Sequence, residues 1–361
     1  MDILDILNIE PYSLDHDAKH QMLNDRLHDL TRLHYNASLE YKRMVDASGI
    51  DINNLPDYEK LPFLPVRLFK EFELRSVAKE DVVKTMTSSG TTGQQKSQIF
   101  LDRTTAANQT KCLTKIVSTF LGNKRVPMLI LDTSAVVKDR RMFSARGAGI
   151  LGFSIFGSKR QYALDENMRL DIEGMKKFLS EHEGETIFIF GFTFMIWQHF
   201  YKKLKESDYM PDLSKGVLIH GGGWKKLVNE QVSPAEFKQC LNDVCSIPFG
   251  NVHDYYGMVE QTGTIYMECE CGHLHTSAFS DVIIRRPYDF SIADKGEKGL
   301  IEVVSVLPES YPGHVLLTED EGYIEGEDDC PCSRKGKYFK ILGRIKNAEI
   351  RGCSDTYAAK F

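Results

Sequence analysis

Hydroxyl and glycine residues are concentrated in the stretch TSSGTTGQQKS (87–97), which has the composition of an anion-binding loop. Glycine lets the backbone reach positive φ and approach a ligand closely, and successive main-chain N–H groups in such a turn attract anions. The hydroxyls add neutral donors, and Lys96 adds a mobile positive charge. A plain surface turn is the alternative, but this density of donors favours phosphate binding. The candidate contacts are Thr87, Ser88, Ser89, Gly90, Thr91, Thr92, Gly93 and Lys96.

This loop is not the Walker A motif of nucleoside triphosphatases. That motif requires glycine directly before the lysine of G-K-[ST], and Gln95 precedes Lys96 here. The flanking segments DVVKTMT and SQIFLD both look like strands, whereas a Walker A loop leads from a strand into a helix. A plain nucleoside triphosphatase is therefore not indicated.

Two cysteine pairs form a candidate metal site. The segment CECGHLH (269–275) supplies two thiols and two imidazoles, and CPC (330–332) supplies two more thiols. Tetrahedral structural zinc takes four such ligands, although these pairs are C-x-C rather than the commoner C-x₂-C. A group of reduced cysteines on a hairpin is the alternative. We expect a structural Zn²⁺ bound by three or four of Cys269, Cys271, His275, Cys330 and Cys332.

The other cysteines divide into two groups. Cys112, Cys240 and Cys245 lie in apolar patterns typical of helices, so we expect them in the core. Cys353 stands alone in RGCSDTY, where Arg351 would favour its thiolate. Because a thiolate is a nucleophile, Cys353 is a candidate for covalent catalysis, with an incidental exposed thiol as the alternative.

The composition is that of an ordinary globular protein, since the 361 residues are 42% hydrophobic and 27% charged. The length suits about two domains. A net charge of −6 gives no basic footprint for nucleic acid, and no apolar run approaches the roughly 18 residues of a membrane span. The start, MDILDILNIEPYS, carries acidic residues where a signal peptide has basic ones. We therefore expect a cytoplasmic protein with reduced cysteines.

Alternating strand and helix patterns predict an α/β fold. Short apolar runs typical of strands buried on both faces occur at 127–132, 186–192 and 216–222. Helical patterns lie between and after them, at 168–181, 194–205 and 233–244. Such alternation indicates a mostly parallel sheet, and ligands gather at the carboxyl edge of such sheets. The motif HGGGW (220–224) directly follows the third run, so it is a candidate wall of that crevice or else a simple turn.

The segments on either side of this pattern differ from it. Residues 1 to about 80 are polar and helix-like, and we expect Asp102 to cap a helix that ends at Leu121. After about residue 264 the pattern changes to smaller, mixed or antiparallel strands.

Five separated motifs occur in the order found in adenylate-forming acyl and aryl ligases, and the chain resembles that superfamily over roughly residues 85 to 352. They are TSSGTTGQQKS, HGGGW, DYYGMVEQTG, LLTEDEGY and LGRIKNAEIRG. Within the superfamily the chain is most similar to the acyl-protein synthetases of bacterial bioluminescence, through LPFLPVRLFKEFEL, GGGWKK and AEIRGC. In that family the synthetase subunit activates a fatty acid and hands its acyl group to a reductase.

The resemblance implies a fold and a division into domains. The expected fold is the large domain of an adenylate-forming ligase, with mostly parallel buried sheets and helices and a smaller mixed β part. We expect an N-terminal helical region (1–80), an adenylation domain (81–342) and a short mobile tail (343–361) with Lys346 at its hinge. Larger ligases continue here into a second domain with a catalytic lysine, so transfer to coenzyme A by the usual route is not expected.

The resemblance also implies how ATP and Mg²⁺ are bound. A carboxylate attacks the α-phosphorus of ATP, giving an acyl-adenylate and pyrophosphate, and the loop with Lys96 holds the departing phosphates. Glu260 takes the Mg²⁺ position, and Lys96 and Glu260 are counted with Cys353 as catalytic residues. Asp320 binds the ribose hydroxyls, and Arg344 reaches the ribose or the α-phosphate. The remaining nucleotide contacts expected are Gly221, Gly222, Tyr256, which lies against the adenine, and Gly257.

An aromatic segment and Cys353 are the candidates for binding the acyl group and for accepting it. FGFTFMIW (190–197) is a candidate lining of a hydrophobic acyl or aryl site, with plain core as the alternative. The resemblance makes Cys353 the residue that takes the acyl group as a thioester and presents it to a partner protein such as a reductase. The alternatives are a ligase that delivers to coenzyme A, a carrier protein or an amine, and a binding homologue without catalysis.

Overall fold

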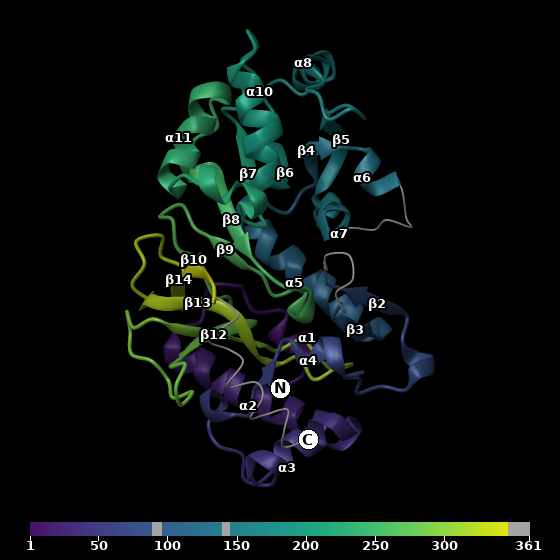
Figure 1. Ribbon diagram of the computed structural model, residues 1–361, viewed down its shortest axis with the longest axis vertical. Coiled ribbons are helices and arrows are strands. Elements are labelled where there is room, and N and C mark those ends of the chain that lie inside the picture. Colours follow the sequence, from purple (N-terminus) through teal and green to yellow (C-terminus); the bar gives the residue numbers. More distant parts are fainter. Residues whose placement is uncertain (89–95, 139–144, 346–361) are drawn as a thin grey trace. The chain divides into compact units, whose positions relative to one another are not determined.

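The structure of the chain is a computed structural model that describes residues 1–88, 96–138 and 145–345 (Figure 1). The chain forms two compact units. Unit 1 comprises Met1–Ile116, Gly257–Tyr266 and His273–Phe361, and unit 2 comprises Val117–Tyr256 and Met267–Gly272. Helix α5 (Arg103–Leu121) and strand β9 (Tyr266–Glu268) both contain a boundary between the two units.

Unit 2 is built on parallel strands that follow one another in the order β8-β7-β6-β4-β5. Their bounds are β4 (Val126–Thr133), β5 (Gly157–Leu164), β6 (Ile187–Phe192), β7 (Gly216–Gly221) and β8 (Val252–Tyr256). Strand β6 is buried along its whole length, and β4 is buried after its first residue. The three short apolar runs are therefore the central strands β4, β6 and β7, which confirms the parallel α/β prediction.

Helices cover the strands of unit 2. The helices and single turns are α6 (Ala135–Lys138), α7 (Ala145–Phe153), η4 (Ser154–Phe156), α8 (Ile172–Glu181), α9 (Thr193–Met195), η5 (Ile196–Tyr201), α10 (Lys202–Lys205), η6 (Lys225–Glu230), α11 (Pro234–Cys245) and η7 (Phe249–Asn251). In Figure 1, α10 and α11 lie beside β6 and β7. Leu129, Ile189, Phe200 and Phe237 belong to the buried cluster between these strands and helices. That shared core holds the strand ends in fixed positions.

The helix expected at 194–205 contains an irregularity that its apolar pattern does not reveal. It begins as α9, continues through the π-helical turn η5 and ends as α10. A π-turn inserts one extra residue per turn, so it shifts the face that later side chains present.

Unit 1 contains antiparallel strands in the order β11-β12-β13-β14-β10 and a separate hairpin, β2–β3. The bounds are β1 (Leu64–Pro65), β2 (Lys84–Thr87), β3 (Gln98–Leu101), β10 (Leu274–His275), β11 (Ser280–Arg285), β12 (Gly299–Ser305), β13 (Val315–Glu327) and β14 (Lys337–Arg344). Strand β1 pairs in parallel with β13. The change to antiparallel strands after about residue 264 is as expected from the sequence.

Helices of the N-terminal region pack on these antiparallel strands. They are α1 (Ile3–Ile6), α2 (His16–Ala37), α3 (Leu39–Ser48), η1 (Tyr58–Lys60), α4 (Leu68–Glu71) and η2 (Lys79–Asp81), and η8 (Val259–Gln261) follows later in the chain. The Asp15 carboxylate caps α2 by accepting from the Ala18 N–H, as Asp102 does for α5 from Thr105. Arg26 of α2 donates to the main-chain oxygen of Val306, which fastens this helix to the end of β12.

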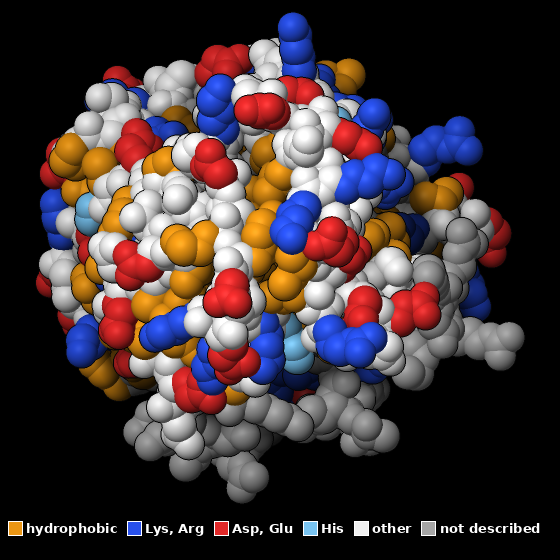
Figure 2. All heavy atoms as spheres, turned by 90° about the horizontal axis from the view of Figure 1, so that it is seen from above, with side chains coloured by type: hydrophobic (Ala, Val, Ile, Leu, Met, Phe, Trp, Pro, Cys, Tyr) orange, Lys and Arg blue, Asp and Glu red, His pale blue; other side chains and the backbone are white. Residues whose placement is uncertain are grey.

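The three cysteines expected in the core differ in how far they are buried. Cys112 and Cys245 are fully buried as expected, whereas Cys240 is half-buried at the edge of the core. None of the helices within the described ranges is long and apolar enough to cross a membrane. On the face drawn in Figure 2, basic and acidic side chains are interspersed around hydrophobic ones.

Candidate functional site

The hydroxyl-rich loop connects the two strands of the β2–β3 hairpin. Thr87 pairs with Gln98 at the end of the hairpin. Beyond this pair, the Ser88 N–H donates to the Ser97 carbonyl, and the Ser97 N–H donates to the Ser88 hydroxyl at 3.0 Å. Thr87 and Lys96 are exposed and Ser88 is half-buried. The strand–loop–strand arrangement agrees with the exclusion of a Walker A site; Ser89, Gly90, Thr91, Thr92 and Gly93 lie outside the described residues.

Glu260 is a buried carboxylate on the short turn η8. Its residue is only 8% exposed. Burial raises the pKa of this carboxyl, while the Ser97 side chain and the positive charges of Lys70 and Arg344 act in the opposite direction. A bound cation would favour the charged form of this buried carboxyl, which is the form that a Mg²⁺ ligand requires.

Two residues that the sequence did not single out hold the Glu260 turn in place. Tyr311 is fully buried and its hydroxyl donates to the main-chain oxygen of Glu260 at 2.9 Å. The amide of Gln261 donates to the carbonyl oxygens of Val303 and Gly313, at 3.1 and 2.8 Å. The Pro-Gly pair within SYPGH (310–314) is a general turn signal, but no pattern in the sequence indicates a contact between Tyr311 and Glu260.

Asp320 and Arg344 lie opposite one another on β13 and β14. They are register partners, and the Arg344 Nε lies 3.5 Å from an Asp320 carboxylate oxygen. The Arg344 side chain is 79% exposed, so this pair contributes little to stability. The exposed guanidinium and the carboxylate beside it instead form a polar edge of unit 1, where the carboxylate can accept hydrogen bonds from a ligand and the guanidinium can donate them.

The glycine motif of unit 2 lies at the carboxyl end of β7. Gly221 ends the strand, and Gly222 has a φ of +83°. A Cβ at Gly222 would lie 2.7 Å from the ring of Phe192, so both the conformation and the space require glycine there. Tyr256 ends the neighbouring strand β8 and is half-buried, and Gly257, which follows it, is exposed.

A polar contact at the same strand ends was not expected from the sequence. The Thr193 hydroxyl lies 3.0 Å from Nδ1 of His220 and donates to the carbonyl of Gly221. Burial, together with the positive charge of Lys238, lowers the pKa of His220 to about 3. His220 is therefore neutral at physiological pH and fixes the β6–β7 ends rather than carrying charge.

The aromatic segment after β6 packs largely into the core of unit 2. Phe190 is fully buried and stacks on Phe153 with ring centroids 4.4 Å apart. Phe192 is 8% exposed, and its ring lies 2.7 Å from where a Cβ at Gly222 would stand. Of the residues in 190–197, Phe192 is thus placed best to border a site at the strand ends, while Phe190 and Ile196 belong to the core.

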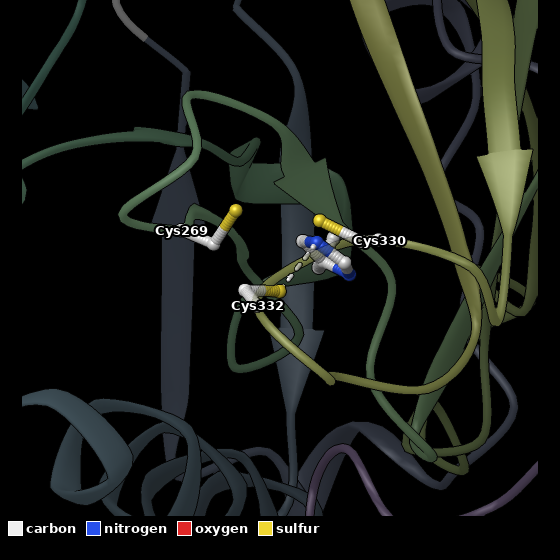
Figure 3. A group of neighbouring side chains, drawn as sticks. Cys269, Cys330 and Cys332 are labelled. Atoms are coloured by element: carbon white, nitrogen blue, oxygen red, sulfur yellow. Dashed lines mark hydrogen bonds between the residues drawn. The ribbon is translucent and has the colours of Figure 1, made fainter.

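Four of the five expected metal ligands form one group. One ligand atom from each of Cys269, His275, Cys330 and Cys332 lies within 4.8 Å of all the others. In Figure 3 the three labelled thiols point toward one another. Cys271 is exposed and is not in this group. Cys353, Arg351 and Lys346 lie outside the described residues.

Comparison with protein families and curated proteins gives three findings. A family model described as "Acyl-protein synthetase, LuxE" matches residues 1–361. A long-chain-fatty-acid–luciferin-component ligase of Aliivibrio fischeri is 22% identical, over 97% of this chain and 91% of the relative. A ligase of the same description from Vibrio harveyi is 21% identical, over 91% of this chain and 85% of the relative.

Solved structures show the same fold. An open conformation of 2-hydroxyisobutyryl-CoA ligase matches 93% of this chain and 77% of its own, with a TM-score of 0.70 and 14% identity. The same ligase in the postadenylation state matches 92% of this chain and 69% of its own, with a TM-score of 0.68 and 13% identity. The chain thus has the α/β fold of an adenylate-forming ligase.

Proposed function

The chain belongs to the LuxE acyl-protein synthetase family, and from this we propose that it activates a long-chain fatty acid as acyl-adenylate and passes the acyl group through Cys353 to a partner protein. Members of this family are ATP-dependent ligases that activate a fatty acid and transfer its acyl group to a protein. The observation that carries the proposal is the match of the family model over residues 1–361. Long-chain acids are proposed because both curated relatives are described as long-chain-fatty-acid ligases.

ATP and Mg²⁺ are the cofactors of the first step. The N–H groups and hydroxyls of the loop between β2 and β3, with exposed Lys96, would contact the β- and γ-phosphates. The buried carboxylate of Glu260 would hold Mg²⁺, which neutralises phosphate charge when bound. In this role these groups would stabilise the charge that develops as pyrophosphate leaves, and preorganised stabilisation of this kind is usually the largest catalytic contribution.

The ribose and adenine contacts complete the nucleotide part of the proposal. Asp320 would accept hydrogen bonds from the ribose hydroxyls, and Arg344 beside it would donate to the ribose or the α-phosphate. Gly221, Gly222, Tyr256 and Gly257 would border the base and the acyl-adenylate.

Cys353 is proposed as the acceptor in the second step. Its thiolate would attack the acyl carbonyl of the adenylate, forming a thioester and releasing AMP with the electrons of the broken acyl–phosphate bond. The segment 343–361 would then carry the acyl group to the partner's own nucleophile, and the partner is an acyl-accepting protein such as a reductase.

Pyrophosphate release with ATP, Mg²⁺ and saturated fatty acids of increasing length tests the activation step. We expect release that requires the acid and increases from short to long chains. Asp320→Asn removes a charged hydrogen-bond acceptor worth about 1.5–3 kcal/mol, so KM for ATP should rise about tenfold or more. Glu319→Gln is the matched control, because Glu319 is the adjacent acid and Arg344 pairs with Asp320. An equal rise of KM in both variants, or release without any acid, would contradict the proposal.

A further inference from the structure

We propose that Cys269, His275, Cys330 and Cys332 together bind one Zn²⁺, and that this ion fastens the turn between β13 and β14 to strand β10. The ligand atoms lie within 4.8 Å of one another, and none of these cysteines is in a disulfide. With Zn–S near 2.3 Å and Zn–N near 2.0 Å, a tetrahedral site needs ligand atoms roughly 3.5–3.8 Å apart. Small rotations of the thiols close the group to that size.

The chemistry of the donors selects the kind of metal. Three sulfurs and one imidazole nitrogen suit Zn²⁺, whereas Mg²⁺ and Ca²⁺ prefer oxygen ligands. Cys269, His275 and Cys330 are buried and Cys332 is half-buried. Because four protein ligands fill a tetrahedron, the site has no open position for a substrate, which makes it structural rather than catalytic.

The segments that begin at Cys269 and at Cys330 both form the same kind of turn. The Gly272 N–H donates to the Cys269 carbonyl at 2.9 Å, and the Ser333 N–H donates to the Cys330 carbonyl at 2.9 Å. The donating residue has positive φ in each case, +85° at Gly272 and +66° at Ser333. A serine in this region costs of order 1 kcal/mol and persists only where the surroundings require it. A metal bound by the cysteine at the start of each turn is such a requirement.

His275 joins this group to the neighbouring strand. It pairs with Tyr338 of β14, and its Nε2 lies 3.4 Å from the Cys332 sulfur. The His275 ring packs against Tyr12 and Tyr338, with ring centroids 6.2 and 5.4 Å away. The imidazole is thus held with Nε2 toward the Cys332 thiol, as coordination of one ion by both residues needs.

Two other ligand-type residues of CECGHLH are directed elsewhere. Cys271 is exposed, and Nδ1 of His273 lies 2.8 Å from the Glu325 carboxylate. This assigns the first thiol and the last imidazole of the segment to the metal, and it supplies control positions for mutagenesis.

The ion would act on the hairpin of β13 and β14, which carries Asp320 and Arg344, the two residues proposed to bind the nucleotide. The turn with Cys330 and Cys332 follows β13, whose Glu327 pairs with Lys337 of β14, and the same two strands bring Asp320 opposite Arg344 at their other end. A metal that fixes the turn would therefore hold the register of both strands. This consequence rests on the proposed function, whereas zinc binding itself does not.

Metal content of the full-length protein, purified without chelators, tests the assignment. We expect about one zinc per chain, lost in Cys332→Ala and retained in Cys271→Ala, because loss of a ligand weakens affinity by about 100-fold or more. Cobalt substitution of the wild-type chain should give the visible absorption of tetrahedral thiolate coordination, which does not depend on a variant folding. A wild-type chain that binds neither zinc nor cobalt, or equal zinc loss in Cys271→Ala, would overturn the proposal.

The activation assay separates this result from the proposed function. Zinc-loaded protein without acid-dependent pyrophosphate release would contradict adenylation and leave the metal site standing. A chain that binds neither zinc nor cobalt but shows acid-dependent pyrophosphate release would contradict the metal site and leave adenylation standing. Removal of bound zinc with no change in KM for ATP would contradict the role of the ion in the hairpin. Removal of zinc that raises KM for ATP more than it lowers kcat would support the role of the hairpin.

Discussion

The hydrogen bond from Tyr311 to the main chain of Glu260 allows a quantitative test of how the proposed Mg²⁺ ligand is positioned. Tyr311 is fully buried, donates to the Glu260 carbonyl at 2.9 Å and accepts from the Gln109 amide at 3.4 Å. Tyr311→Phe keeps the ring and leaves that buried carbonyl without its donor. The expected loss is about 1–3 kcal/mol in the free energy of unfolding.

Tyr266→Phe is the matched control for this perturbation. Tyr266 is also buried, and its hydroxyl also donates to a main-chain oxygen, that of Asp281, at 3.1 Å. Both variants should therefore lose similar stability. Only Tyr311→Phe should change the Mg²⁺ requirement, because only Tyr311 bonds to Glu260. If the substitution weakens the free energy of Mg²⁺ binding by about 1 kcal/mol, the half-maximal Mg²⁺ concentration rises about fivefold.

Urea unfolding and Mg²⁺ titration of pyrophosphate release are the two measurements. The reasoning is refuted if Tyr311→Phe leaves the free energy of unfolding within about 0.5 kcal/mol of wild type, which is the range of neutral surface changes. It is refuted equally if both variants shift the Mg²⁺ titration by the same factor, since a general loss of rigidity would then explain the effect.

The remaining predictions concern charge. Glu260→Gln should lower the rate of pyrophosphate release by about 100-fold, because it removes the proposed Mg²⁺ ligand. It should not destabilise the fold, because burial raises the pKa of this carboxyl and disfavours its charged form. A variant with lower stability and full activity would contradict this. Burial lowers the pKa of His34 and His220 to about 3. As the pH falls below about 6.5, these histidines therefore become protonated in the unfolded chain but stay neutral in the folded chain. Their contribution to stability is complete above that pH and is lost below it, by about 1.4 kcal/mol each at pH 5.5. Urea unfolding at pH 7.5 and 5.5 should show this fall, and His34→Gln should reduce it.

Local signals in the sequence predicted the elements that position the site. Continuous apolar runs identified the buried central strands β4, β6 and β7 because parallel strands are covered on both faces. Asp102 was expected to cap its helix, and its carboxylate accepts from the Thr105 N–H at 2.8 Å. These features depend on residues within a few positions of one another, so the sequence alone contains the information.

Contacts between distant segments were not available from the sequence. Tyr311 and Glu260 are 51 residues apart, and only the folded chain brings the hydroxyl to the carbonyl. The same limit applied to the cysteines, because spacing could not distinguish Cys269 from Cys271. The turn closed by the Gly272 N–H accompanies the burial of Cys269 and the exposure of Cys271.

The intact mass of the protein after incubation with ATP, Mg²⁺ and long-chain fatty acids tests the central claim most directly, run beside Cys353→Ala. The account predicts a hydroxylamine-labile acyl adduct on the wild-type chain and none on the variant, with pyrophosphate release retained in both. An adduct that persists in Cys353→Ala, or acid-dependent pyrophosphate release with no adduct on the wild type, would contradict it.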